Sequence, residues 1–352
     1  VPERPGHGRL KHLSMFTRQF YVLVSSGTQV VPALQALERQ TRDTRWRRVI
    51  SSVRARVEQG SSLSDAMEAH PAYFDPVYRS MVGAGEAGGV LGTMLARLAD
   101  LTQKRLHVQS SIRGALAYPC LLLVVAFSVL AVMLVFVVPR FAGLFDSMGV
   151  PLPPSTALLL GLGKAAQSYW WLAVLLLAGA GFGLYAYRKT PKGKRLFDTA
   201  VLRLPRFGPI LRSFHTAVVV RLLGSLLDGH VPVLEAIRLT KASATNDCYV
   251  ELLGRAERLV SHGEPLSGVF ARTDLVTPSV HETARSGEQS GRLGEMLLNL
   301  ADFLDEENEI ILRSLTGILE PVILVGLGLL VGFVSVSMFM PLFDLTAMTG
   351  AG

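Results

Sequence analysis

The stretch closest to a known chemical motif is glycine-rich: Gly83-Ala84-Gly85-Glu86-Ala87-Gly88. It formally matches the G-x-G-x-x-G fingerprint, in which a tight turn and a helix N-terminus bind the pyrophosphate of a dinucleotide. That fingerprint needs a preceding strand within a β-α-β unit, and no neighbouring run alternates apolar and polar residues. The phosphate-binding pattern G-x-x-x-x-G-K-[ST] is absent from the sequence. We therefore expect no nucleotide site and no bound cofactor.

Metal-ligand patterns are equally weak. The eight histidines are scattered, and Cys120 and Cys248 give neither a disulfide framework nor a metal-ligand spacing. Five acidic residues near the C-terminal end could hold a divalent ion or form the solvated face of a helix. They are Asp302, Asp305, Glu306, Glu307 and Glu309. We predict the solvated face, no metal, and a protein that is not an enzyme.

The glycine-rich stretch occurs twice. Residues 85–100 (GEAGGVLGTMLARLAD) and 287–302 (GEQSGRLGEMLLNLAD) are identical at ten of sixteen positions, at an offset of 202. Further along the chain, Pro119 and Pro321 keep the same offset. A fixed offset over this length indicates duplication of a whole domain together with the apolar segment that follows it.

Each copy is typical of a glycine-rich turn that opens a helix. Two interpretations of its glutamate remain open. The carboxylate caps free amides at the positive end of the helix, or it meets a cationic group on a partner protein. Two arginines at an offset of 203 likewise either anchor their own domain or contact a partner. The candidate partner-binding residues are Arg18, Gly85, Glu86, Arg221, Gly287 and Glu288.

Upstream of the repeated stretch the offset is 203. Gly60 and Gly263 both close a helical pattern, and Leu63-Ser64 matches Leu266-Ser267. Val31-Pro32 and Val231-Pro232 match at 200 instead, which we interpret as coincidence. We predict a continuous offset of 203 that changes to 202 near residue 74, with an N-cap at Ser64 and about six short helices in each bundle.

Three runs carry no charged residue: 115–138, 165–187 and 321–343, of 24, 23 and 23 residues. A helix needs about 20 apolar residues to cross the hydrocarbon core, whereas a buried helix of a soluble protein stops nearer 10–14. The runs therefore predict transmembrane helices at 115–138, 169–187 and 317–340. The net charge of +7 then has an explanation other than nucleic acid, because basic residues gather at the cytoplasmic ends of such spans.

The positions of the basic residues predict the orientation. Lys104, Arg105 and Arg113 precede the first run, and five basic residues lie between 188 and 195, after the second. The loop between these runs has only two. This asymmetry places both large domains of a multi-pass membrane protein in the cytoplasm. The predicted order is an N-terminal arm (1–12), cytoplasmic helical domain 1 (13–114), a span (115–138), an extracytoplasmic loop (139–168), a span (169–187), cytoplasmic helical domain 2 (188–316), a span (317–340) and an extracytoplasmic tail (341–352).

The predicted fold class is an all-α polytopic membrane protein with two duplicated cytoplasmic bundles and three transmembrane helices. Pro119 and Pro321 lie near the start of two spans, where a proline in a first turn is tolerated and a functional kink is equally compatible. The spans have no ionisable group near mid-membrane, which counts against a small-solute transporter or channel subunit. A scaffold merely tethered to the membrane is a weaker alternative.

A set of short motifs occurs in a fixed order. Phe16-Thr17-Arg18-Gln19 stands near the start, and Gly-Glu-x-x-Gly-x-Leu precedes each membrane entry. Tyr118-Pro119, Glu320-Pro321 and Pro341-Leu342-Phe343-Asp344 complete the set. In this order the chain, from Leu13 to about Thr346, resembles the type II secretion system F protein family, which includes the type IV pilus inner-membrane platform proteins.

The resemblance implies a non-enzymatic platform in the bacterial inner membrane. The implied partners are a cytoplasmic hexameric ATPase, pilin or pseudopilin subunits, other inner-membrane assembly proteins, the lipid bilayer and further copies of the chain as a homo-oligomer. The family usually has an acidic residue where this chain has Gly92 and Gly294, so contacts made through those positions are not expected to carry over. The chain begins at Val1, and we expect an upstream segment. Secretion, pilus and competence-type machines are not distinguished.

Overall fold

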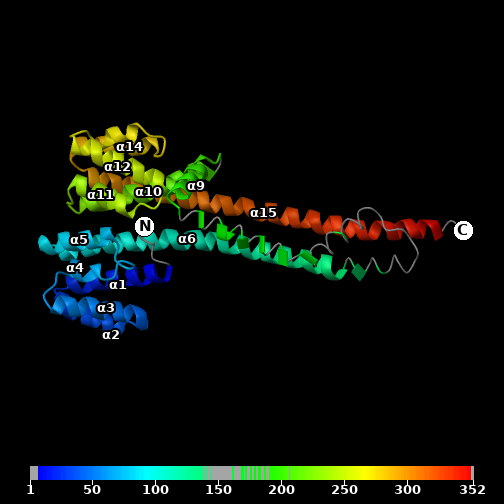
Figure 1. Cartoon of the computed structure of the whole chain (residues 1–352), viewed down its shortest axis with the longest axis horizontal. Coiled ribbons are helices and arrows are strands. Elements are labelled where there is room, and N and C mark those ends of the chain that lie inside the picture. The colour runs from blue at the N-terminus through cyan, green and yellow to red at the C-terminus, as the bar shows by residue number, and fades with distance from the viewer. Residues whose placement is uncertain are drawn as a thin grey trace. The chain divides into compact units, whose positions relative to one another are not determined.

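The computed structural model describes residues 7–137, 190–205 and 207–349, with scattered positions between 139 and 187. These described residues form helices and no strand, so the predicted all-α class is confirmed (Figure 1). The chain divides into two compact units. Unit 1 joins Val1–Ser111 to Pro191–Ile311, and unit 2 joins Ile112–Thr190 to Leu312–Gly352.

Unit 1 contains both repeats. Repeat 1 consists of α1 (His7–Ser25), α2 (Val30–Gln40), α3 (Thr44–Glu58), α4 (Leu63–Glu68), α5 (Pro76–Ala87) and the start of α6 (Leu91–Val132). Repeat 2 consists of α10 (Phe207–Asp228), α11 (Val233–Ser243), α12 (Asp247–Ser261), α13 (Leu266–Ala271), α14 (Pro278–Ser290) and the start of α15 (Leu293–Thr349). The preceding helix α9 (Pro191–Arg203) has no counterpart in the described part of repeat 1.

The helix boundaries confirm the predicted offsets. The second to fourth helices of the two repeats begin and end 203 residues apart, and α5 and α6 begin 202 residues before α14 and α15. Backbone turns with positive φ recur at the same places: Gly27 with His230, Gly60 with Gly263, and Gly89 with Gly291. The Val-Pro match is a coincidence, because Pro32 lies inside α2 whereas Pro232 is the N-cap of α11.

The two cores use different side chains on the same framework. In repeat 1 the indole of Trp46 packs against Phe16 and Tyr73, with ring centroids 5.5 and 4.8 Å apart. In repeat 2 the equivalent position is Tyr249, which is fully buried and whose ring centroid lies 5.5 Å from that of His215. Burial of these apolar faces supplies the main driving force for forming each bundle.

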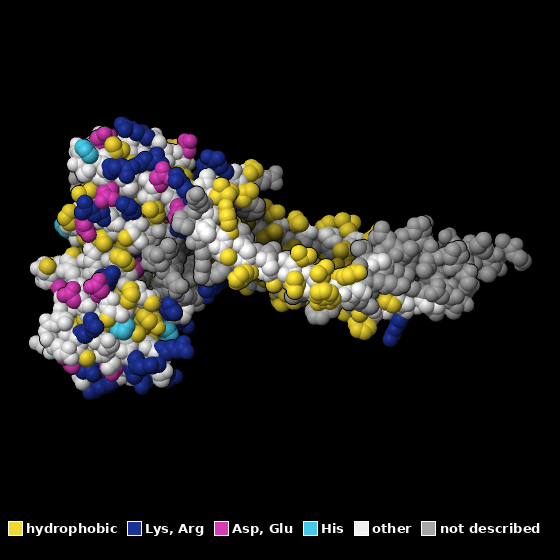
Figure 2. Space-filling model, in the orientation of Figure 1, with side chains coloured by type: hydrophobic (Ala, Val, Ile, Leu, Met, Phe, Trp, Pro, Cys, Tyr) yellow, Lys and Arg dark blue, Asp and Glu magenta, His cyan; other side chains and the backbone are white. Residues whose placement is uncertain are grey.

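The repeats pack against each other within unit 1, where α5 contacts α10 and α11. In unit 2, α6 and α15 present a largely apolar surface, seen as the yellow side chains along these helices in Figure 2. After Val132, α6 continues as a short π-helix, η1 (Met133–Val137).

Among the described residues, three helical stretches are long and apolar enough to cross a membrane: Leu91–Val137, Gly208–Asp228 and Leu293–Val336. The predicted spans at 115–138 and 317–340 fall in the first and last of these. Gly208–Asp228 is more than half buried within protein, so we assign it to the bundle of repeat 2. The predicted span at 169–187 lies mostly outside the described residues.

Candidate functional site

The repeated Gly-Glu pairs lie at helix ends, not helix starts. Gly85 and Glu86 belong to the last turn of α5, and Gly287 and Glu288 lie near the end of α14. The predicted position of these residues, in a turn before a helix, is therefore wrong. The chain leaves the helix only at the later glycine of each motif, Gly89 or its equivalent, where φ becomes positive.

Glu86 binds the start of a short helix that precedes it in the sequence. Its two carboxylate oxygens accept hydrogen bonds from the backbone amides of Leu63, at 2.6 Å, and Ser64, at 3.0 Å. The N-cap of this helix, α4, is Ser62, whose hydroxyl accepts from the amide of Asp65, so the predicted N-cap at Ser64 is wrong. Serine and glutamate together satisfy amides that a helix start leaves free.

Glu288 does the same in repeat 2. Its Oε1 accepts from the amide of Leu266 at 2.6 Å, and its Oε2 accepts from the hydroxyl of Ser267 at 2.5 Å. The N-cap of α13 is Pro265, whose side chain makes no capping bond. The glutamates therefore do cap a helix start, where a negative charge is favourable, but they cap α4 and α13 and not the helices that follow them.

The glycine before each glutamate allows two helices to approach closely. A Cβ atom on Gly85 would lie 2.9 Å from Cγ of Met94 and 3.1 Å from Cα of Leu91. A Cβ atom on Gly287 would lie 2.8 Å from Cα of Leu293. Gly85 and Gly287 thus fit the tight turn into α6 and α15, and each neighbouring glutamate fixes the short helix beside that turn.

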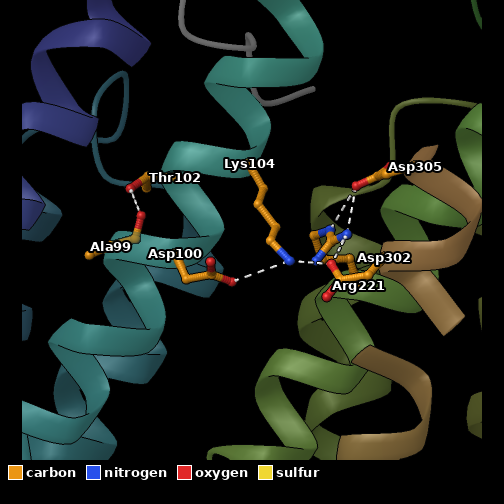
Figure 3. Close-up of polar contacts among 7 residues, drawn as sticks. All are labelled: Ala99, Asp100, Thr102, Lys104, Arg221, Asp302 and Asp305. Atoms are coloured by element: carbon orange, nitrogen blue, oxygen red, sulfur yellow. Dashed lines mark hydrogen bonds and ion pairs between the residues drawn. The ribbon is translucent and has the colours of Figure 1, made fainter. Parts of the chain in front are cut away.

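The two predicted arginines occupy different environments. Arg221 on α10 has a side chain only 6% exposed. It donates hydrogen bonds to Asp302, at 2.8 Å, and Asp305, at 2.6 Å, both on α15 (Figure 3). Arg18 is exposed and donates one long bond of 3.4 Å to Gln103, which stands where repeat 2 has Asp305. Arg221 is therefore an anchor within its own bundle, whereas Arg18 is largely free to meet another group.

Lys104 extends the Arg221 cluster across the boundary between the repeats. Its ammonium group donates to Asp302 and lies 3.9 Å from Asp100 on its own helix, as Figure 3 shows. One turn of α6 further on, His107 lies 3.7 Å from Glu309. Lys104 and His107 of α6 thus contact acidic side chains of α15, and the two helices run parallel there.

Arg97 makes a second bridge between the repeats. Its guanidinium donates to the backbone carbonyl of Asp228, the last residue of α10, and pairs with the Asp228 carboxylate at 2.9 Å. Helix C-termini carry unsatisfied carbonyls and a partial negative charge. A cation from repeat 1 therefore caps a helix of repeat 2.

The charges around Asp302 outweigh the effect of its burial. Burial alone would raise the pKa of Asp302, but hydrogen bonds from Lys104 and Arg221 lower it below the ordinary value of 3.8. The stability that this carboxylate contributes is present above that value and is lost as the pH falls through the lowered pKa. Asp302 and Asp305 are thus partners in ion pairs, and the predicted solvated face is wrong for these two residues.

In unit 2, the repeated Tyr-Pro and Glu-Pro pairs face each other. The hydroxyl of Tyr118 donates to the carboxylate of Glu320 at 2.9 Å, and these positions are equivalent in the two repeats. Pro119 lies deep inside α6, and Pro321 lies deep inside α15. Neither is in a first turn, so the interpretation as a helix entry is wrong and the kink stays a prediction.

Sequence reasoning missed Arg97 and Lys104. The available signal was a difference within the repeated stretch, because repeat 2 has Asn299 and Glu306 at the equivalent positions. Over the described residues, no three histidine, cysteine or acidic side chains are grouped so that they could hold a metal ion. The site is thus a set of ion pairs that connects the two helical bundles.

Two equivalent helical bundles, each continuing into a long apolar helix, define the class as a duplicated α-helical membrane protein. The chain belongs to the family described as type II secretion system (T2SS), protein F, whose model matches residues 16–139 and 219–341. The two matches correspond to the two repeats, so the duplication is confirmed.

Curated relatives cover nearly the whole chain. The chain is 33% identical to the type IV pilus assembly protein PilC of Myxococcus xanthus over 344 residues. These residues make up 97% of this chain and 82% of the relative. It is 36% identical to the PilC protein of Thermus thermophilus, over 96% of this chain and 83% of the relative. It is 35% identical to the type II secretion system protein F of Aeromonas hydrophila, over 96% and 87%.

Proposed function

We propose that the chain is the inner-membrane platform protein of a type IV pilus or type II secretion machine. The observation that carries this proposal is the family match over both repeats, together with relatives named for both machines across 96–97% of the chain. The contrast between apolar helices in unit 2 and charged bundles in unit 1 supports a membrane protein with large polar domains (Figure 2).

Both bundles are proposed to lie in the cytoplasm, where they engage a hexameric assembly ATPase. The basic residues before the first apolar run and after the second support this orientation. ATP hydrolysis is assigned to the partner, and pilin or pseudopilin subunits are the proposed cargo. The chain itself supplies no catalytic step.

Force transfer through α6 and α15 is the proposed mechanism. Each is a single helix that begins in a bundle and continues into an apolar run, over Leu91–Val132 and Leu293–Thr349. The Lys104 and Arg97 bridges couple the two bundles, so a displacement of one is passed to the other. Pro119 and Pro321 are proposed to give α6 and α15 a bend, because each removes a backbone hydrogen bond.

Deleting the gene from its bacterium tests the function. Surface fibres or secreted cargo should be lost, while mature prepilin-type subunits accumulate in the inner membrane, and a wild-type copy should restore assembly. Normal fibres and normal secretion in the deletion strain would refute the proposal. Reporters fused after residue 190 and near residue 153 test the orientation, since only the first should be active in the cytoplasm.

The candidate partner-binding residues need a separate experiment. Glu86→Lys and Glu288→Lys remove the caps of α4 and α13, so assembly should be divided by the amount of folded protein. Reduced assembly per folded molecule supports a partner contact at Gly85-Glu86 or Gly287-Glu288. Assembly that falls only in step with protein level supports capping alone. Arg18→Glu and Arg221→Glu belong in the same comparison, because one arginine is exposed and the other is buried.

A further inference from the structure

We propose that the exposed face of α1 binds the exposed face of α15 in a second copy of the chain, repeating between molecules the contact that joins the two repeats within one molecule. The occupant of the α1 face is thus repeat 2 of another copy. The inference stands apart from the proposed function, because it concerns a chain-to-chain contact that can be measured without fibre assembly.

The contact inside one molecule uses two different faces. Repeat 1 contributes α6, through Arg97 and Lys104. Leu101 lies about one turn from each of them, on the same side of the helix, and is buried. Repeat 2 contributes the C-terminal half of α10, where Ser225 and Arg221 are buried. The two helices run antiparallel, because Arg97 meets the end of α10 at Asp228 whereas Lys104 reaches the Arg221 cluster. Leu101 therefore lies at the level of Ser225.

The equivalent faces are both open. Leu101 is 3% exposed, but its counterpart Phe303 on α15 is 52% exposed. Ser225 is 5% exposed, but its counterpart Val22 on α1 is 55% exposed. Each copy therefore leaves one face of each kind uncovered, and each of these faces carries a large exposed apolar side chain. A contact of the same kind with a second copy would bury Val22 against Phe303.

The charges on the two open faces change together. Inside one molecule, Arg97 pairs with Asp228, and their counterparts Asn299 and Ser25 are both neutral. Loss of the cation on one face is thus matched by loss of the anion on the other.

At the second charged position, the residue on α15 has the opposite charge to its counterpart on α6, whereas α1 and α10 both carry an arginine. The counterpart of Lys104 is Glu306, which is exposed on α15. The counterpart of Arg221 is Arg18, whose hydrogen bond in the described structure is to neutral Gln103. Where repeat 2 supplies its own second carboxylate, Asp305, repeat 1 lacks one. Glu306 of a second copy would supply the missing carboxylate to Arg18, and opposite charges placed in this way set the register of an interface.

The contact joins unlike faces, so each copy offers one binding face on α1 and one on α15. Contacts of this head-to-tail kind close into rings when the rotation between copies allows it.

A charge exchange tests the pair in the full-length chain. Arg18→Glu and Glu306→Arg should each weaken self-association by roughly tenfold or more, since like charges then face each other. The double variant Arg18→Glu/Glu306→Arg should recover wild-type association, and Arg255→Glu, at another exposed arginine, should leave it unchanged. Light scattering of the protein in detergent measures the association, and the thermal midpoint shows that each variant is folded. Single variants with wild-type association, or a double variant without recovery, would overturn the proposal.

Cysteine cross-linking in membranes gives an independent measurement. In a chain whose Cys120 and Cys248 are replaced by serine, Val22→Cys/Phe303→Cys should form disulfide-linked oligomers on oxidation, and Arg255→Cys/Phe303→Cys should not. Neither single-cysteine variant should cross-link. A cross-link from Val22→Cys alone shows α1 against α1 and contradicts the proposed pairing, as does the absence of any cross-link in the Val22→Cys/Phe303→Cys variant.

Discussion

The two repeats share their framework and differ in how they treat equivalent polar residues. In both, a glutamate near the end of the fifth helix caps the short fourth helix, and positive-φ turns stand at three equivalent places. Yet Arg221 is buried between two aspartates whereas Arg18 is exposed beside a glutamine. The local caps and turns thus follow from the sequence that the two repeats share, whereas the burial of an equivalent residue depends on the elements that pack against it.

The largest expected difference between the repeats concerns these arginines. Arg221→Met should lower the free energy of unfolding by about 2–4 kcal/mol, because it leaves Asp302 and Asp305 close together without their main cation; the loss is discounted because Asp302 is partly exposed. Arg18→Met should change it by less than about 0.5 kcal/mol, as is usual for surface sites. Thermal unfolding in detergent measures both. Equal losses from the two variants would contradict the assignment of Arg221 as an internal anchor.

The next largest difference between the repeats is expected at the glycine that follows the shared Gly-x-Leu motif, which is Gly92 in repeat 1 and Gly294 in repeat 2. A Cβ atom on Gly294 would lie 2.9 Å from Cα of Asp228 and 2.9 Å from the carbonyl carbon of Leu227, both backbone atoms. Gly294→Ala should therefore cost about 1–3 kcal/mol through overpacking. Gly92 has nothing within 4 Å of such an atom, so Gly92→Ala should be neutral or gain up to about 1 kcal/mol from reduced backbone entropy. Thermal unfolding measures both variants. A midpoint for Gly294→Ala that is equal to or higher than that for Gly92→Ala would contradict the prediction.

Part of this could be predicted from the sequence. The fixed offsets and the glycines at 60 and 263 placed equivalent helices correctly, because a helix must end where its backbone turns to positive φ. The charge-free runs indicated the apolar helices for a similarly local reason.

Other features depend on residues far apart in the chain. The bond from the Leu63 amide to Glu86 spans 23 residues, and the Lys104–Asp302 contact spans 198. Neither pair is related by a local period, so no helical or strand pattern could identify it. The sequence did show that Lys104 and Glu306 differ within a repeated stretch, but only the packing of the bundles shows why.

Loss of the shared caps should destabilise both repeats, and less strongly than the changes at Arg221 and Gly294. Glu86→Gln and Glu288→Gln keep the size of the side chain but remove the charge, and each should cost about 0.5–2 kcal/mol, the usual value of a lost cap. The cost should be larger at Glu288, because α13 has a proline N-cap without a capping side chain whereas Ser62 still caps α4. Hydrogen exchange of the amides at the start of α4 and α13 reports each cap separately. Unchanged protection in both helices would contradict the capping geometry.

The smallest effect concerns the first turn of each bundle. His230 has a φ of 60° where repeat 1 has Gly27 at 88°, and it is the non-glycine residue with positive φ among the described positions. A side chain in this conformation costs about 1–2 kcal/mol, and part of that cost is offset because glycine gains more entropy on unfolding. His230→Gly should therefore raise the free energy of unfolding by about 0.5–1 kcal/mol, and Gly27→His should lower it by a similar amount. Because the imidazole is exposed, its removal forfeits no core packing. A lower thermal midpoint for His230→Gly would mean that His230 is held by a contact and not merely tolerated by the turn, and the equivalence of the two turns would then end at the backbone.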